Sequence, residues 1–215
     1  MKYYPAYLDL RERPCVVIGG GAVAERKAIA LLEAGASVTI ISPELTAKLH
    51  DLSNSGKIIH IQKHYEEKDL SGEFLVLVAT DSSEVNTRVA SACRKKQVLV
   101  NVATSPEESS FIVPSVVDRG DLLIAISTSG TSPALAKKVR QDMEQRYGKE
   151  YEIFLEKLSA VRKRVLDEIA DEGRRRQVFQ AIVDSDVIDL FRQGKTHEAE
   201  LRMAEIAGLK HRVWK

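Results

Sequence analysis

Short apolar runs alternate with segments of helical periodicity through the first half of the chain. The helical segments follow the first and the fourth apolar run, ending near Gly35 and Lys96. The apolar runs lie at residues 15–18, 37–41, 58–62, 74–79 and 98–102. Strands that alternate with helices are typical of a parallel sheet with helices on both faces. The pattern therefore predicts a doubly wound α/β domain over residues 1–112.

The pattern changes after Phe111. Apolar segments at 111–117 and 122–127 flank a turn-like stretch at 118–121, which predicts a hairpin outside the regular alternation. A helix follows, and its expected apolar face carries Leu135, Val139 and Met143. We assign the hairpin and this helix to a separate small region over residues 113–147.

The last third of the chain is strongly charged and has helical spacing almost throughout. Breaks at Ser185 and Gly194 divide it into several helices. One amphipathic stripe is formed by Ile153, Phe154, Leu158, Val161, Val165 and Ile169. The sequence thus predicts a helical carboxy-terminal domain over residues 148–215.

Composition and charge add few constraints. Hydrophobic residues make up 44% of the 215 residues and charged residues 29%, with a formal net charge of +1. A near-neutral chain has no global attraction for nucleic acid or for a membrane surface. The amino terminus lacks the pattern of a signal peptide, and no apolar stretch reaches the roughly 18 residues of a membrane span. We expect a cytoplasmic protein with neither nucleic acid nor membrane as partner.

The cysteines and histidines do not suggest a metal site. Cys15 lies in an apolar run and Cys93 in a helical segment, and together they form neither a disulfide framework nor a metal-binding spacing. The five histidines are scattered and form no ligand cluster. We expect two buried thiols in a reducing compartment and no bound metal.

The first apolar run leads into the motif Gly19-x-Gly21-x-x-Ala24, in the segment CVVIGGGAVA. The first glycine permits a tight strand-to-helix turn, the second lets the backbone approach a pyrophosphate, and Ala24 lets the helix pack closely on the strand. With the alternation described above, this indicates a Rossmann-type sheet. The alternative is a turn without a ligand. The expected cofactor-binding residues here are Gly19, Gly20, Gly21, Ala22, Val23 and Ala24.

The tip of the second strand should contact the ribose of a dinucleotide. No carboxylate occupies the last strand position, so Ser42, Glu44 or the backbone around Pro43 must fill that role. No arginine is available over residues 40–47 to hold a 2′-phosphate, which favours NAD over NADP. Thr80, at the end of the fourth apolar run, is also expected beside the cofactor. The alternative for that segment is a helix cap formed by Asp81 or Ser82.

A hydroxyl-rich loop precedes the helix of the small region. Ser132 as N-cap and Pro133 at the first helical position explain its end, but not its other hydroxyl groups. Such a loop can bind a carboxylate or a phosphate at the helix N-terminus, and plain capping is the alternative. The candidate substrate-binding residues are Ser127, Thr128, Ser129, Gly130, Thr131 and Ser132.

Several ordered motifs give the chain a specific resemblance. They are YPAYLDL at 4–10, VIGGGAVAERKA at 17–28, ATD at 79–81 with Val85-Asn86, SFIVPS at 110–115, DRGDL at 118–122 and ISTSGTSP at 126–133. On these motifs the chain resembles the precorrin-2 dehydrogenase/sirohydrochlorin ferrochelatase family, the amino-terminal module of sirohaem synthases. The correspondence runs to about Tyr147 and continues more weakly through the helical tail.

The resemblance implies an enzyme that oxidises the tetrapyrrole precorrin-2 to sirohydrochlorin with NAD. It also implies a homodimer whose subunits intertwine through residues 113–147. Residues 19–24 would then hold the pyrophosphate, Pro43 and Glu44 would border the adenosine, and residues 127–132 would approach the substrate. The chain leaves no room for the methyltransferase domain of fused members, so we expect a separate enzyme to make its substrate.

The sequence departs from the family at Thr104. Bifunctional members, which also insert iron, carry at this position an aspartate that is assigned to proton removal, and a threonine cannot act as a base near neutral pH. Thr128 stands where some fused members carry a serine that can be phosphorylated. Thr104 and Thr128 remain the catalytic candidates, with the base unassigned and Glu107 or Glu108 as substitutes.

The sequence therefore predicts precorrin-2 oxidation without efficient iron insertion. Two alternatives stay open: a bifunctional dehydrogenase and ferrochelatase, and a non-catalytic NAD(H)-sensing module. The absence of a basic stripe argues against a sensor that acts on DNA.

Overall fold

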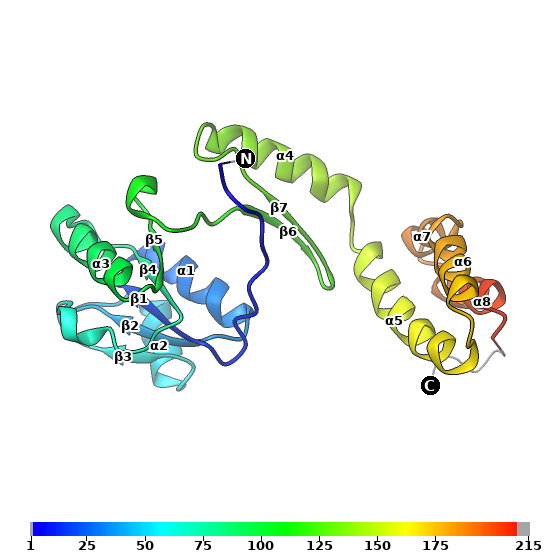
Figure 1. Cartoon of the computed structure of the whole chain (residues 1–215), viewed down its shortest axis with the longest axis horizontal. Helices are drawn as coiled ribbons and strands as arrows, with labels where there is room; N and C mark the ends of the chain where they lie inside the picture. Colours follow the sequence, from blue (N-terminus) through cyan, green and yellow to red (C-terminus); the bar gives the residue numbers. More distant parts are fainter. Residues whose placement is uncertain (1, 210–215) are drawn as a thin grey trace. The chain divides into compact units, whose positions relative to one another are not determined.

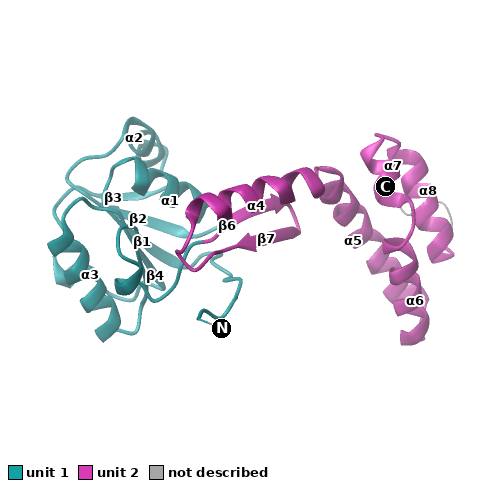
Figure 2. Ribbon diagram, turned by 90° about the horizontal axis from the view of Figure 1, so that it is seen from above, with its two compact units in different colours: residues 1–113 teal, residues 114–215 magenta. Residues whose placement is uncertain are grey.

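The computed structural model describes residues 2–209, which fall into two compact units that divide between Val113 and Pro114 (Figure 2). The first unit holds the alternating strands and helices of the amino-terminal half (Figure 1). The second holds the hairpin and all the helices that follow it.

The core of the first unit is a five-stranded parallel sheet. Its strands are β1 (Pro14–Ile18), β2 (Ser37–Ile41), β3 (Ile59–Ile61), β4 (Leu75–Val78) and β5 (Leu99–Val102), in the order β3-β2-β1-β4-β5. Val17 is in register with Ile40 on one side and with Leu77 on the other, so the carboxyl ends of the strands form one edge. This order and the parallel pairing confirm the predicted Rossmann-type sheet.

Helices cover both faces of this sheet. α1 (Ala22–Glu33) and α2 (Ala47–Asn54) pack on one face, and α3 (Ser83–Lys95) packs on the other. Ala24 and Ala28 are fully buried, and their small side chains allow α1 to lie close to the sheet. Two short 3-10 helices, η1 (Glu67–Asp69) and η2 (Pro106–Glu108), lie in the connections before β4 and after β5.

The third strand is less buried than its apolar run suggested. Ile58 is buried, but Ile59 is 65% exposed because β3 is the edge strand of the sheet. An apolar run therefore indicated the strand correctly without indicating how much of it is covered.

The second unit begins with an antiparallel hairpin of β6 (Ser115–Arg119) and β7 (Leu122–Ile126). Asp118 Oδ1 accepts a hydrogen bond from the backbone N–H of Gly120 at 2.9 Å and so fixes the turn. α4 (Pro133–Arg146) follows, and Arg119 Nε donates to the carbonyl of Tyr147 at its end. The hairpin of the sequence analysis is present, with its first strand starting later than expected.

The face expected for α4 is only partly covered by the described residues, since Val139 and Met143 are half-buried. Leu135 is 51% exposed, whereas Ala136 is the buried residue of this helix. The start of α4 matches the prediction, because Ser132 is the N-cap and Pro133 is the first helical residue. Ser132 Oγ accepts a hydrogen bond from the N–H of Leu135.

The remaining helices share a core of their own. They are α5 (Glu150–Glu168), α6 (Glu172–Val183), α7 (Val187–Arg192) and α8 (Thr196–Ala207). Phe154, Val161 and Val165 of the predicted stripe are buried in this core, but Ile153 is 37% exposed. Adjacent residues of a helix point about 100° apart, and in α5 Phe154 takes the direction of the core. Among residues 2–209, no helix combines the length and apolar character needed to cross a bilayer.

The turn from β1 to α1 tolerates no side chain at two positions. Gly19 has a φ of +115°, and a Cβ there would lie 2.2 Å from the carbonyl oxygen of Ala79. A Cβ on Gly20 would lie 1.9 Å from the carbonyl oxygen of Glu44. Both neighbours are backbone atoms, which cannot move aside as the tip of a flexible side chain can. Glycine therefore lets three loops meet at this edge of the sheet.

We predict that Gly19→Ala lowers the free energy of unfolding by at least about 2 kcal/mol, because it adds backbone strain to a steric clash. Gly21→Ala is the matched control, since a Cβ on Gly21 would meet nothing within 4 Å. The free energy of unfolding of that control should stay within about 1 kcal/mol of the wild-type value. Urea unfolding measures both, and equal stability of the two variants would contradict the packing described here.

Candidate dinucleotide site

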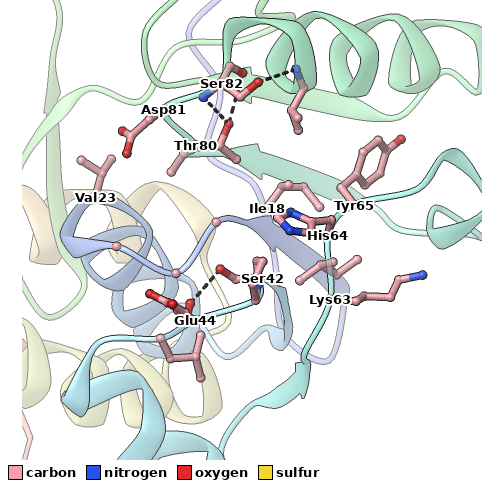
Figure 3. Close-up of a pocket in the computed structure, with 18 of the residues that line it drawn as sticks. Ile18, Val23, Ser42, Glu44, Lys63, His64, Tyr65, Thr80, Asp81 and Ser82 are labelled. Atoms are coloured by element: carbon pink, nitrogen blue, oxygen red, sulfur yellow. Dashed lines mark hydrogen bonds between the residues drawn. The ribbon is translucent and has the colours of Figure 1, made fainter.

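A cleft of about 990 Å³ lies at the carboxyl edge of the parallel sheet (Figure 3). Its walls come from four connections of the first unit: β1 to α1, β2 to α2, the segment after β3, and β4 to α3. The lining residues include 19–23, 42–46, 63–65 and 79–82, together with Val85 and Arg88. Every predicted cofactor-binding residue lines this cleft except Ala24, which is buried between α1 and the sheet.

The amino terminus of α1 provides the floor for an anion. Gly21 is the N-cap and is exposed, and it has no side chain with which to cap the helix. The space in front of it is open, as the empty surroundings of a Cβ there indicate. A helix N-terminus with uncapped N–H groups attracts a phosphate through hydrogen bonds and through its dipole. The geometry therefore fits the pyrophosphate of a dinucleotide.

The connection from β2 to α2 forms the second wall. Ser42 is 7% exposed, and its Oγ donates to the carbonyl of Glu44 at 2.7 Å. The backbone N–H of Thr46 donates to the carbonyl of Gly20 at 3.0 Å, and Thr46 Oγ1 donates to Glu25 Oε2 at 2.5 Å. Ser42 thus stabilises its own loop, Thr46 holds that loop against the glycine turn, and Glu44 is the exposed carboxylate of this wall.

The third wall, Lys63 to Tyr65, was missed by the sequence analysis. Lys63 Nζ lies 2.8 Å from Glu66 Oε2 and 2.7 Å from Asp69 Oδ1, and these hydrogen bonds raise the pKa of Lys63. Its charge is therefore compensated. The signal was available in principle, because Lys63 follows β3 and the ligand edge of a parallel sheet holds the residues after every strand.

Tyr65 lies deeper in the same wall. Its side chain is 7% exposed, and no described residue is a hydrogen-bond partner of its hydroxyl group. Burial raises the pKa of Tyr65 to about 12, so the phenol stays neutral. It serves the cleft as an apolar surface.

The turn after β4 is fixed by a buried asparagine. Thr80 Oγ1 donates to Asn86 Oδ1 at 2.7 Å, and Asn86 Nδ2 donates to the carbonyl of Thr80 at 3.2 Å. Ser82 is the N-cap of α3, and its Oγ accepts from the N–H of Val85 at 3.3 Å. Ser82 therefore caps the helix, as one interpretation predicted. Thr80 and Asp81 line the cleft, and their place beside the cofactor stays a prediction.

Thr104 is joined to the same asparagine. Asn86 Nδ2 also donates to Thr104 Oγ1 at 3.3 Å, which links the exposed Thr104 to the turn at Thr80. Thr104 is not among the residues that line the cleft. Glu108 Oε1 accepts from Thr87 Oγ1 at 2.6 Å, and Glu107 Oε2 accepts weakly from Ser105 Oγ at 3.4 Å.

A partly buried lysine of α1 reaches the end of β5. Lys27 Nζ donates to Asn101 Oδ1 at 2.8 Å, and Asn101 Nδ2 donates to the carbonyl of Phe111 at 3.1 Å. Burial lowers the pKa of Lys27, and the nearby Arg26 adds to this effect. The pair ties α1 to β5 and to the segment that leaves the first unit.

The hydroxyl-rich loop lies in the second unit and binds largely to itself. Thr128 Oγ1 donates to the carbonyl of Ser132 at 3.0 Å and accepts from its N–H at 3.1 Å. Ser127 Oγ accepts from the N–H of Ser129 at 3.0 Å. Ser129 and Thr131 are exposed, and their hydroxyl groups have no hydrogen bond to any described residue. Two hydroxyl groups therefore remain available to a ligand.

Within the described part of the chain, no three histidine, cysteine or acidic side chains come together in a way that could hold a metal ion. Cys15 and Cys93 are both buried, and burial raises the pKa of each thiol to about 11. Because the thiolate is the reactive form, both cysteines are unreactive core residues.

Comparison with known proteins gives two family matches. Residues 6–115 match a family described as "Putative NAD(P)-binding", and residues 119–146 match one described as "Sirohaem biosynthesis protein central". The siroheme synthase of Photobacterium profundum is 34% identical over 206 residues, which are 96% of this chain and 44% of that protein. That of Methylobacillus flagellatus is 36% identical over 220 residues, 98% of this chain and 46% of that protein.

A solved structure agrees with the whole fold. The structure of SirC, a precorrin-2 dehydrogenase, matches with a TM-score of 0.80 and 28% identity, covering 96% of this chain and 99% of that one. The chain spans less than half the length of the two siroheme synthases. These matches support the predicted nicotinamide dinucleotide cofactor; the residues that bind it stay a prediction.

We predict that Gly21→Asp abolishes NAD binding, because a side chain and a negative charge would occupy the space intended for the pyrophosphate. The fold should survive, since a Cβ at this position meets no neighbour. Titration calorimetry with NAD measures the affinity, and circular dichroism checks the fold. Gly21→Ala separates bulk from charge and should bind more tightly than Gly21→Asp. Undiminished NAD affinity in Gly21→Asp would remove the α1 N-terminus from the binding site.

Proposed function

The chain belongs to the NAD(P)-binding family of sirohaem biosynthesis, and we propose that it is a precorrin-2 dehydrogenase that forms sirohydrochlorin. The observation that carries the proposal is the match to SirC, which extends over nearly all of both chains and so includes the hairpin and the helical tail as well as the sheet. A match to the sheet alone would support only dinucleotide binding.

The cleft supports this reaction through positioning. When bound, NAD supplies the acceptor for the hydride that leaves the tetrapyrrole. The N-terminus of α1 would hold the pyrophosphate and the loop at Ser42 would border the adenosine, while Asn86 fixes the turn at Thr80 at the far end of the cleft. Hydride transfer needs the two reactants held face to face more than it needs side-chain chemistry. Rigid loops with their polar groups satisfied suit that task.

NAD rather than NADP fits the charges of the cleft. A 2′-phosphate at the β2 wall would lie near the exposed Glu44 carboxylate, which repels it. Lys63 lines the cleft, but Glu66 and Asp69 already neutralise its charge. No arginine lies in the loop after β2.

The second unit supplies candidates for substrate binding and for dimer contacts. Ser129 and Thr131 offer free hydroxyl donors near the N-terminus of α4, where a substrate carboxylate would be stabilised. Val116, Leu123 and Leu135 expose 43%, 41% and 51% of their surface on the hairpin and α4. Exposed apolar residues of this kind support a homodimer contact through residues 113–147.

Iron insertion is the finer question. Metal entry requires a base that takes up the pyrrole N–H protons. The hydroxyl group of Thr104 accepts a hydrogen bond from Asn86, but a threonine hydroxyl is not a base near neutral pH. We therefore infer a dehydrogenase that metallates sirohydrochlorin poorly. The bifunctional enzyme is the alternative.

The proposed function predicts that the purified chain converts precorrin-2 to sirohydrochlorin under anaerobic conditions with NAD. The absorbance of the product measures this conversion. NADP in place of NAD should lower kcat/KM, because the β2 wall, residues 42–46, carries no cation to neutralise the 2′-phosphate. No conversion above a reaction without enzyme would refute the dehydrogenase, and equal use of NADP would refute the account of the β2 wall.

Thr104→Asp should gain metal insertion. An aspartate at this position would restore a carboxylate, and a general base contributes about 10²–10⁴-fold to such steps. The assay follows Fe²⁺ or Co²⁺ entry into sirohydrochlorin by absorbance, comparing wild type, Thr104→Asp, Thr104→Asn and a reaction without protein. Wild-type metallation well above the protein-free rate would contradict the inference, and Thr104→Asn separates the charge from the shape of the new side chain.

A further inference from the structure

The cleft contains a carboxylate to which neither the glycine motif nor the family motifs assigned a role. Asp81 lines the cleft in the turn from β4 to α3, and its side chain is exposed. Figure 3 shows it beside Thr80 and Ser82, on the side of the turn that faces Val23. Among the described residues, no hydrogen bond or ion pair engages its side chain.

Oxidation of precorrin-2 releases a proton as well as a hydride, so the proposed reaction needs a proton acceptor. Position 104 provides no base. Glu108 accepts from Thr87, and Lys27 donates to the buried Asn101. Glu44 and His64 also line the cleft without a side-chain hydrogen bond among the described residues, but they follow β2 and β3, on the other side of β1 from the turn after β4. Asp81 is the unengaged carboxylate of that turn.

We propose that Asp81 accepts the proton that the tetrapyrrole loses during its oxidation, an inference that rests on the proposed dehydrogenase function. One C–H bond of the macrocycle breaks with its electron pair, and NAD takes up that hydride. A second bond, N–H or C–H, breaks and leaves its electron pair in the new double-bond system of the product. Its proton forms an O–H bond with an Asp81 carboxylate oxygen and then passes to water, which the exposed side chain contacts.

The surrounding residues hold Asp81 in place without consuming its charge. Thr80 is fixed through both its hydroxyl and its carbonyl by Asn86, which is 3% exposed. Ser82 is fixed as the N-cap of α3, and its own N–H donates to Thr80 Oγ1 at 3.2 Å. The residues on either side of Asp81 are therefore anchored, and the carboxylate projects from a rigid turn. A preorganised base of this kind avoids reorganisation during the reaction.

The test uses Asp81→Asn, which keeps the shape of the side chain and removes its ability to take a proton. We expect kcat for precorrin-2 oxidation to fall by about 10²-fold or more, as is typical when a general base is lost. The dissociation constant for NAD, measured by calorimetry, should stay equal or decrease, because the variant removes a negative charge from an anion-binding cleft. Asp81→Glu should recover part of the rate.

Asp81→Ala gives a readout that a structural role would not affect. Acetate added to this variant should restore turnover in proportion to its concentration, because it can occupy the vacated space and accept the proton. Glu84→Gln is the matched control, since it removes a carboxylate from the first turn of α3, close in sequence to Asp81, at a residue that does not line the cleft. It should oxidise precorrin-2 at the wild-type rate.

Each remaining outcome decides against the inference. Wild-type kcat in Asp81→Asn would show that another group takes the proton. A tenfold or greater loss of NAD affinity in Asp81→Asn would make Asp81 a cofactor ligand. An inactive Asp81→Ala that acetate does not rescue, together with an inactive Asp81→Glu, would make its role structural. Failure of the wild-type chain itself to oxidise precorrin-2 would overturn the proposed function, and this inference with it.

Discussion

Two close approaches between backbone segments hold the cleft together, and the rest of the site depends on them. The carbonyl of Ala79 lies too close to Gly19 for that residue to carry a Cβ, and the carbonyl of Glu44 lies too close to Gly20. The loops after β1, β2 and β4 can therefore converge on one point at the edge of the sheet. Convergence puts the N-terminus of α1 at the bottom of the cleft, and it brings Ser42 and Thr80 to opposite walls.

Several polar side chains in the cleft, next to it and in the loop before α4 stabilise loops and are not free for a ligand. Ser42 donates to its own loop, Thr80 and Thr104 both bond to Asn86, and Thr128 closes a ring with the backbone of Ser132. Satisfied polar groups of this kind make a rigid framework. Ligand binding in the cleft then falls to the backbone N–H groups of α1 and to unengaged side chains such as Glu44, His64, Asp81 and Arg88. This division suits a reaction in which positioning matters more than side-chain chemistry.

Local signals allowed much of this to be predicted from the sequence. The strands β2, β4 and β5 lie in their predicted apolar runs, and Ser132 with Pro133 marks the start of α4, because these features depend on neighbouring residues alone. The glycine motif indicated the turn correctly, since its backbone geometry excludes other residues.

The unpredicted features depend on contacts between distant segments. Lys63 lines the cleft because β3 pairs with β2, a sheet order that no local pattern encodes. Asp81 looked equally suited to capping α3, and only the structure shows that Ser82 takes that role and leaves the carboxylate free. Leu135 looked like a core residue, yet about half of its surface is exposed.

A structure of the chain with bound NAD tests the central claim most directly, namely that the convergence of three loops at glycine builds a dinucleotide site. The account predicts pyrophosphate oxygens within hydrogen-bonding distance, about 3 Å, of the N–H groups at the start of α1. It also predicts the adenosine against the loop from Ser42 to Glu44 and the nicotinamide on the side of Thr80 and Asp81. A dinucleotide bound away from the α1 N-terminus, or with its adenosine at the Thr80 turn, would contradict it.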